Sequence, residues 1–272
     1  MSHAMLRDVG TRAIGDRLRL YQPDKALLFS NLDARRPGYR RAVQLARDAG
    51  YEPVTRLAGG HAAAFLEASV AFAWATSDPK ASMHIAHRFE LFSGWVVAAL
   101  RSLGLDARVG EVEGEYCPGE YSVNVEGRVK VMGVGQRVIR GAAHVGGVIT
   151  VGQTVALQET LIPVYDALDL EFHPPSAGGV ADFDPNITPA HVIEAMIGVI
   201  GPEYREVHES TFDSSLLSAA QALTPLHSAE RSPSAGAVLR PTLQTSGAKT
   251  LLQGDDWPST VDDVDNANGS HD

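Results

Sequence analysis

Cys117 is the single cysteine of this 272-residue chain, and it lies in a dense stretch of polar, aromatic and turn-forming residues, 115–122, with the sequence EYCPGEYS. One thiol cannot form an intrachain disulfide, so Cys117 is either a small buried apolar residue or a nucleophile. Alone, it is more typical of packing, because free cysteine is among the most buried residue types. Lys130 follows thirteen residues later. An ammonium near a thiol favours the reactive thiolate and can stabilise an oxyanion, so the pair could support nucleophilic chemistry.

Lys130 lies on the second strand of a predicted β-hairpin at 121–133. Valines alternate with polar residues on both sides of a turn around Gly127. A three-residue loop places valine opposite valine and Lys130 opposite Asn124 on the other face, whereas a two-residue loop would mix valines with charged residues. The expected valine pairs are Val125 with Val129 and Val123 with Val131. This register directs Lys130 away from the valine face, where either a solvated or a functional lysine is possible.

A glycine turn at 56–62, RLAGGHA, follows a predicted strand. Adjacent glycines allow backbone N–H groups to approach a carbonyl, carboxylate or phosphate without interference from a Cβ atom. Taken alone, the pattern is more typical of an ordinary Gly-Gly turn.

Two further motifs do not predict a site by themselves. The segment 133–137, GVGQR, lacks the third glycine and the strand-to-helix context of a dinucleotide-binding loop. His84 and His87 have a spacing that suits a metal on a helix, but the sequence names no third ligand. No metal site is therefore predicted.

Strands and helices are both indicated, without a strict βαβ rhythm, so the predicted fold class is α+β. Besides the hairpin, strands are predicted at 26–30, 51–57 and 147–151. Helices are predicted at 37–49, from Asp78 as N-cap to about 103, between 157 and 168, at 189–200 after Thr188 as N-cap, and at 206–223. Pro163 is expected to kink the third helix or to mark its start.

The composition is that of a soluble globular protein, with 44% apolar and 21% charged residues. One cysteine and no signal-peptide-like start predict a cytoplasmic location, and the absence of a long apolar run argues against a membrane protein. A net charge of −10 argues against nucleic acid as the main partner. Residues 229–272 are rich in Ser, Pro, Gly and Asp and are predicted to be a disordered acidic tail after a catalytic domain at 1–228.

Taken together, these motifs make the chain resemble the lipoate–protein ligase and octanoyltransferase family, which is related to biotin protein ligases. The resemblance covers about residues 26–184. It is carried by the arginine and glycine turn, by the Lys-x-x-Gly element with its Gln-Arg extension, and by the Cys-Pro-Gly segment followed by an aromatic residue. The matching residues are Arg56, Gly59 and Gly60; Lys130, Gly133, Gln136 and Arg137; and Cys117, Pro118, Gly119 and Tyr121. The last element is most similar to the branch that passes octanoyl or lipoyl groups between lipoyl-bearing proteins.

The resemblance implies a catalytic domain with a central mixed or antiparallel sheet flanked by helices. It implies transfer of an octanoyl or lipoyl group, through a Cys117 thioester assisted by Lys130, onto the lysine of a lipoyl domain. The implied partners are the glycine cleavage H protein or the E2 subunit of a 2-oxoacid dehydrogenase, with acyl carrier protein as a possible donor. No cofactor is required for this reaction. The implied substrate-binding residues are Arg56, Gly59, Gly60, His61, Gly133, Gln136 and His144.

Two alternatives remain open. One is an ATP-dependent lipoate–protein ligase that uses ATP and Mg, in which Lys130 contacts a lipoyl-adenylate and Cys117 is a packing residue. The other is a non-catalytic family member that binds an acyl group or a lipoyl domain. His61 stands where ATP-dependent ligases usually have a third glycine, which argues against adenylation. The His-Gly pair of several relatives appears here in altered form at 144–147, HVGG. Lipoyl domains are often acidic, as this chain is, so docking would need a local basic patch.

Overall fold

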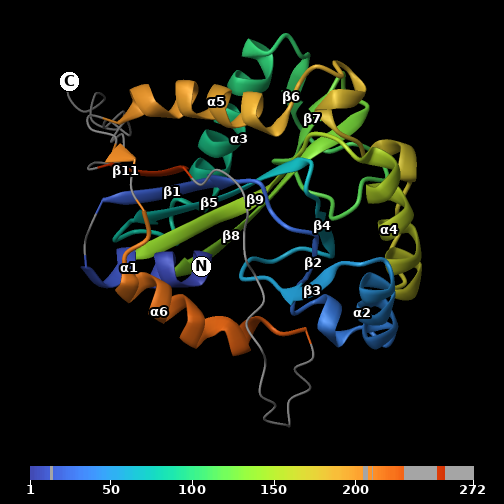
Figure 1. Cartoon of the computed structure of the whole chain (residues 1–272), viewed down its shortest axis with the longest axis horizontal. Coiled ribbons are helices and arrows are strands. Elements are labelled where there is room, and N and C mark those ends of the chain that lie inside the picture. Colours follow the sequence, from blue (N-terminus) through green and yellow to red (C-terminus); the bar gives the residue numbers. More distant parts are fainter. Residues whose placement is uncertain (13–14, 205–207, 210, 230–249, 255–272) are drawn as a thin grey trace, which may run out of the picture.

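The computed structural model describes residues 1–12, 15–204, 208–209, 211–229 and 250–254. Its centre is an antiparallel sheet with the strand order β10-β11-β1-β5-β9-β8-β7-β6 (Figure 1). The strands are β1 Asp16–Tyr21, β5 Ser69–Ser77, β6 Ala107–Val109, β7 Val123–Val125, β8 Val129–Ile139, β9 Ala142–Thr150, β10 His208–Glu209 and β11 Thr250–Gly254.

A second, smaller sheet has the order β3-β2-β4, with β2 and β3 parallel and β2 and β4 antiparallel. These strands are β2 Ala26–Phe29, β3 Glu52–Thr55 and β4 Ala63–Phe65. Helices α2 (Tyr39–Asp48) and α4 (Thr154–Ala167) contact each other and share an apolar core with this sheet. The predicted α+β class, with a central mixed or antiparallel sheet flanked by helices, is confirmed.

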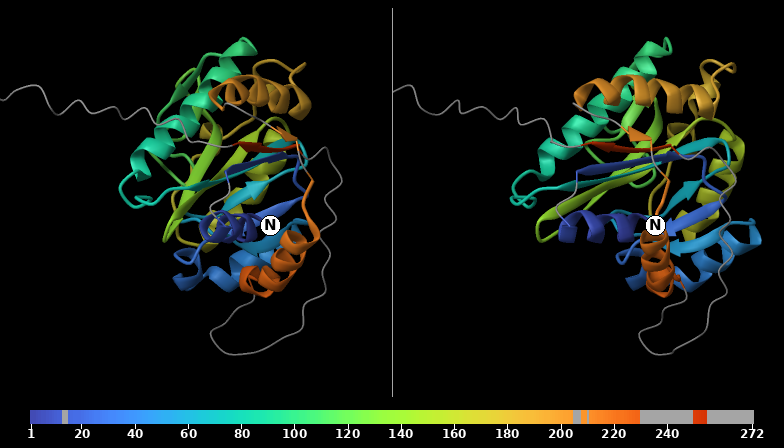
Figure 2. Two further views of the ribbon diagram at one scale, coloured as in Figure 1. Left: turned by 90° about the vertical axis from the view of Figure 1, so that its left-hand side faces the viewer. Right: turned by 60° about the vertical axis from the view of Figure 1, so that its left-hand side comes forward.

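Both faces of the large sheet are covered by helices. Helices α3 (Ile85–Ser102) and α5 (Pro189–Ile200) pack over one face, and α1 (Ser2–Arg12) and α6 (Ser214–Leu223) cover the other (Figure 2). In β5 the large side chains Phe72 and Trp74 enter the core beneath α3 and α5, whereas Ala75 packs beneath α1. Since successive side chains point to opposite faces of a strand, β5 can build two cores at once.

Helix α5 occupies the predicted residues, and its N-cap Thr188 accepts a hydrogen bond from the His191 backbone N–H. The predicted start of α3 at Asp78 is wrong, because α3 begins at Ile85. The Asp78 carboxylate instead binds the fully buried Arg88 at 2.6 Å and His84 at 3.0 Å. A buried guanidinium needs a counter-charge, and this requirement outweighs a helix cap.

Two other helices also begin at residues that differ from the predicted ones. Helix α4 begins at Thr154 and contains Pro163, so this proline does not mark its start. The last helix begins at Ser214 rather than at 206, after Asp213 caps it by accepting a hydrogen bond from the Leu216 backbone N–H. Residues 208–209 form β10 instead.

The hairpin register is confirmed near the turn. Val125 pairs with Val129, and Asn124 pairs with Lys130. Further along, Val123 pairs with Met132 rather than with Val131, because a β-bulge interrupts the register between Val123 and Asn124. A bulge adds one unpaired residue to a strand and redirects the side chains that follow.

Most of the segment predicted to be a disordered tail, 230–249 and 255–272, lies outside the described residues. Residues 250–254, which composition assigned to that tail, form β11 between β1 and β10. The main chain of β11 supplies hydrogen-bond partners along one side of β1, so pairing rather than composition decides the structure of this segment. Among the described residues, no helix combines the length and apolar character needed to cross a membrane.

Candidate active site

Cys117 has a left-handed backbone with φ of +44°, which is uncommon for a residue other than glycine. The backbone N–H and the backbone carbonyl of Cys117 both form hydrogen bonds with side chains. Its N–H donates to the Tyr165 hydroxyl at 2.8 Å, and its carbonyl accepts from the Lys130 ammonium at 2.8 Å. Such constrained conformations persist where the surroundings over-determine them, often at functional sites. The thiol is therefore presented by a rigid loop.

The Cys117 sulfur lies against the glycine turn that follows β3. Its Sγ accepts a hydrogen bond from the His61 backbone N–H at 3.2 Å and another from Arg56 Nη2 at 3.3 Å. The same Arg56 nitrogen donates to the His61 carbonyl. The turn thus aims a backbone donor and a guanidinium at the thiol.

Gly60 makes this close approach possible. Its φ is +93°, and a Cβ atom added there would lie 2.7 Å from Cys117 Sγ and 2.4 Å from Arg56 Nη2. A side chain at Gly60 would therefore displace the thiol, the guanidinium or both.

We expect Gly60→Ala to impair both the reactivity of Cys117 and the stability of the turn. The left-handed backbone alone costs about 1–2 kcal/mol for an alanine, and the clash with Sγ adds to it. The matched control is Gly59→Ala, because a Cβ atom at Gly59 meets nothing within 4 Å. Thiol alkylation rates and thermal unfolding of both variants measure the difference, and equal behaviour of the two would contradict the role of Gly60.

Lys130 is buried, with 1% of its surface exposed. Its ammonium donates to Glu115 Oε1 at 2.8 Å, to the Tyr116 carbonyl at 2.9 Å and to the Cys117 carbonyl at 2.8 Å. All three N–H donors of the side chain are therefore used. Lys130 is not a solvated strand lysine. It holds the loop that carries the thiol.

Glu115, which the sequence did not single out, organises the rest of this loop. Besides binding Lys130, its Oε1 accepts from the Gly119 backbone N–H and from Ser122 Oγ, and its Oε2 accepts from the Val112 backbone N–H. Its side chain is fully buried in an ion pair with Lys130. A buried carboxylate needs such partners, and these partners shape the turn after Pro118.

The charges around the sulfur favour the thiolate. Burial acts to raise the pKa of Cys117, but the Arg56 guanidinium and then Lys130 act in the opposite direction, together with the hydrogen bonds from Arg56 and His61. The result is a pKa for the Cys117 thiol below its ordinary value. Cysteines in electropositive surroundings of this kind are the reactive ones.

Tyr165 of α4 joins the thiol loop to the glycine turn. Its hydroxyl donates to the Ala62 carbonyl at 2.8 Å and accepts from the Cys117 N–H. Burial raises the pKa of Tyr165 well above its ordinary value, so the hydroxyl keeps its proton. The sequence placed Tyr165 on a helix but offered no signal for this bridge.

The imidazole of His61 is oriented by Asp33, another residue that the sequence did not single out. Its Nδ1 lies 2.9 Å from Asp33 Oδ1, and the carboxylate is fully buried while the imidazole is 24% exposed. The other carboxylate oxygen accepts from the Ser30 backbone N–H at 2.8 Å. Asp33 lies 28 residues before His61, so only the fold brings the pair together.

Residues 1–167 match the family model described as the lipoyl protein ligase A/B catalytic domain. The chain belongs to this family. The match covers the glycine turn, Cys117 and Lys130, so all three lie within the catalytic domain of the lipoyl protein ligases.

Among curated relatives of this lipoyl protein ligase domain are two proteins named octanoyl-[GcvH]:protein N-octanoyltransferase. The one from Geobacillus kaustophilus is 27% identical over 53% of the chain and 51% of the relative. The one from Bacillus velezensis is 28% identical over 53% of the chain and 50% of the relative. The alignments thus span about half the length of these relatives.

Solved structures share the fold at lower identity. A lipoate-protein ligase A bound with ATP has a TM-score of 0.63 and 20% identity, covering 82% of this chain and 87% of that one. A putative lipoate protein ligase from Thermoplasma acidophilum with bound lipoic acid has a TM-score of 0.61 and 20% identity, covering 83% and 89%. These likenesses support the lipoyl protein ligase fold.

The remaining predicted site residues of this lipoyl protein ligase domain are placed differently. Gly133 lies beside Lys130, since an added Cβ atom would be 3.4 Å from Lys130 Cε. Gln136 instead holds the start of α3: it accepts from Arg88 Nε at 2.6 Å and donates to the Ile85 carbonyl at 3.0 Å. No contact within the described residues joins Gln136 to Cys117, and its role in substrate binding stays a prediction.

His144 lies on β9, opposite Ala75 of β5 and Arg137 of β8. It is buried, and its Nδ1 has no hydrogen-bond partner among the described residues. Burial lowers the pKa of His144 to about 4, so the imidazole is neutral at pH 7. None of the described contacts connects it with the thiol, and its predicted role is likewise untested.

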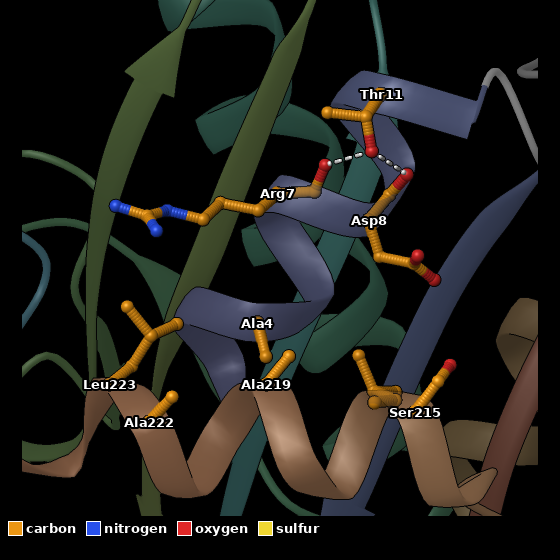
Figure 3. Close-up of a pocket in the computed structure, with 9 residues that line it drawn as sticks. Ala4, Arg7, Asp8, Thr11, Ser215, Ala219, Ala222 and Leu223 are labelled. Carbon is orange, nitrogen blue, oxygen red and sulfur yellow. Dashed lines mark hydrogen bonds between the residues drawn. The ribbon is translucent and has the colours of Figure 1, made fainter.

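The described part of the chain contains no group of three or more His, Cys, Asp and Glu side chains that could hold a metal ion. A cavity of about 350 Å³ lies between α1 and α6 (Figure 3). Arg7 and Asp8 line it from α1, and Ala219 and Ala222 line it from α6. It shares no lining residue with the Cys117 cluster, so we do not assign it to the active site.

Proposed function

We propose that this protein is an acyltransferase that moves an octanoyl or lipoyl group onto the lysine of a lipoyl domain through a thioester on Cys117. The observation that carries the proposal is the double donation to Cys117 Sγ, from the Arg56 guanidinium and the His61 N–H. Both interactions stabilise a thiolate, and a residue that served only for packing would not require them. The names of the curated relatives support octanoyl transfer.

The reaction has two balanced steps. In the first, the Cys117 thiolate attacks the donor carbonyl, an S–C bond forms, and collapse of the tetrahedral oxyanion expels the donor group, which takes up a proton if it is an amine. In the second, the neutral lysine amine of the acceptor attacks the thioester. A C–N bond forms, the C–S bond breaks, the thiolate returns, and the nitrogen loses a proton.

Two contacts favour this proposal over an ATP-dependent ligase. Glycine turns that bind phosphate use free backbone N–H groups, but the His61 N–H is directed at the sulfur. Lys130, which would contact an acyl-adenylate, already donates to three oxygens. We propose lipoyl-domain proteins as partners. The donor is a lipoyl-bearing protein, such as the glycine cleavage H protein, or an acyl carrier protein, and the proposed transfer needs neither ATP nor Mg.

The direct test is intact-mass measurement after mixing the protein with an octanoylated carrier protein. We expect one octanoyl group on the wild type, removal of that adduct by hydroxylamine, and transfer to an added lipoyl domain. Cys117→Ser should not form the hydroxylamine-labile adduct. An unmodified wild type, or an unchanged adduct on Cys117→Ser, would contradict the proposal.

The alternatives predict different results in the same preparation. A ligase would release pyrophosphate from ATP in the presence of lipoate, and this release would survive Cys117→Ala. A non-catalytic member would bind an octanoylated lipoyl domain without any transfer. Neither result is expected from a protein that acts through a thioester.

A further inference from the structure

The proposed transfer has a requirement that the thiol alone does not meet. When the donor holds its acyl group as an amide of lysine, the leaving group is an amine, which leaves well only if it receives a proton. In the second step the acceptor amine must lose one. A proton-transfer group positioned near the sulfur would serve both steps. The inference drawn from this requirement rests on the proposed function.

Three polar side chains near the sulfur are poorly suited to this task. Arginine keeps its proton in proteins, which excludes Arg56. The three donors of Lys130 are committed to oxygens of Glu115 and of the loop backbone. The Tyr165 hydroxyl donates to the Ala62 carbonyl, and burial raises its pKa well above the ordinary value.

His61 differs from these groups. Its backbone N–H lies 3.2 Å from Cys117 Sγ, so its side chain branches from the residue that touches the thiol. Its Nδ1 is paired with the buried Asp33 carboxylate, whereas its Nε2 makes no hydrogen bond within the described residues. With 24% of the side chain exposed, the imidazole is accessible to a substrate.

The pairing with Asp33 defines the tautomer. A carboxylate acceptor at Nδ1 keeps a proton on that nitrogen and leaves Nε2 to gain or lose one, as in catalytic triads. Asp33 is itself held in place, because its other carboxylate oxygen accepts a hydrogen bond from the Ser30 backbone N–H. The orientation of the His61 imidazole is therefore fixed by a carboxylate that cannot easily rotate.

We propose that His61 is the proton-transfer residue of the acyl exchange and that Asp33 is its positioning residue. In the first step Nε2 protonates the lysine nitrogen as the C–N bond of the donor amide breaks and the S–C bond forms. In the second, Nε2 takes a proton from the acceptor amine as the new C–N bond forms and the thiolate is released. The proton on His61 is restored, and no other reactant is needed.

The test compares two donors with leaving groups of different basicity. One is a lipoyl domain octanoylated on its lysine, an amide; the other is octanoyl-coenzyme A, a thioester whose thiolate leaves without protonation. The readout is the single-turnover rate of Cys117 acylation. For His61→Gln we expect the amide reaction to slow by about 10²-fold or more, with the thioester reaction changed by less than about threefold. Asp33→Asn should reproduce this selectivity, and the loss should be in kcat rather than KM.

A role limited to structure would affect both donors equally, and that result would overturn the proposal. A second readout is rescue: added imidazole should restore the amide reaction of His61→Ala. Cys117 alkylation reports whether each variant keeps the loop folded, and His87→Gln on α3 is the matched control. An undiminished amide reaction in both His61→Gln and Asp33→Asn would also overturn it. If wild type accepts octanoyl from neither donor, the proposed function itself fails; if Cys117 loads normally but the donors do not differ, only the role of His61 fails.

Discussion

Replacing Lys130 with methionine is expected to lower the free energy of unfolding by about 3–5 kcal/mol, the usual cost of removing one partner of a buried ion pair. Methionine fills a similar volume but leaves the Glu115 carboxylate buried without its counter-charge, and it leaves the Tyr116 and Cys117 carbonyls without a donor. Because these carbonyls belong to the thiol loop, acyl transfer should be lost as well. Urea unfolding and single-turnover acylation measure the two effects.

Two companion variants make this experiment specific. Lys80→Met removes an exposed lysine from the loop before α3 and should change stability by less than about 0.5 kcal/mol. Lys130→Met combined with Glu115→Gln should recover part of the stability, because no uncompensated charge remains buried. A loss below about 1 kcal/mol in Lys130→Met, or no recovery in the double variant, would contradict the described network.

Removing the guanidinium in Arg56→Gln should slow alkylation of Cys117 at pH 7 by roughly tenfold or more, since an opposite charge in contact shifts ionisation by at least that factor. Arg56 is the strongest of the influences that lower the pKa of the thiol. Without it the pKa rises, the thiolate fraction at neutral pH falls, and the alkylation profile moves to higher pH. At a pH above both midpoints the two proteins should react at similar rates.

The pH profile of Cys117 alkylation also tests whether the charge of Arg56, rather than its shape, favours the thiolate. Arg56→Lys keeps the positive charge and should retain much of the effect, although it loses the hydrogen bond to the His61 carbonyl. Arg40→Gln removes an exposed guanidinium on α2 and should leave the profile unchanged. A pH profile of Arg56→Gln that coincides with that of the wild type would show that Arg56 does not activate the thiol.

Patterns of short range predicted much of this fold. Alternation of valines placed Lys130 opposite Asn124, because a slip of one residue would expose the valine face. A capping threonine and a following glycine bounded α5 correctly. The register shift between Val123 and Asn124 and the late start of α3 were missed, because the alternating and capping patterns give no sign of them. The start of α3 depends on folding, which buries Arg88 and pairs it with Asp78.

For the site, the sequence by itself determined the candidates: a lone thiol, a lysine on a hairpin and a glycine turn. It did not decide between packing and chemistry for Cys117, or between solvent and core for Lys130. Only the tertiary structure decided that Lys130 lies in the core, because the environment of a charge is set by groups that folding brings together. For Cys117 it supplies the contacts on which the proposed chemistry rests. Glu115 and Asp33 are ordinary acids in the sequence. In the folded chain they are buried, one holding Lys130 and the other holding His61 beside the thiol.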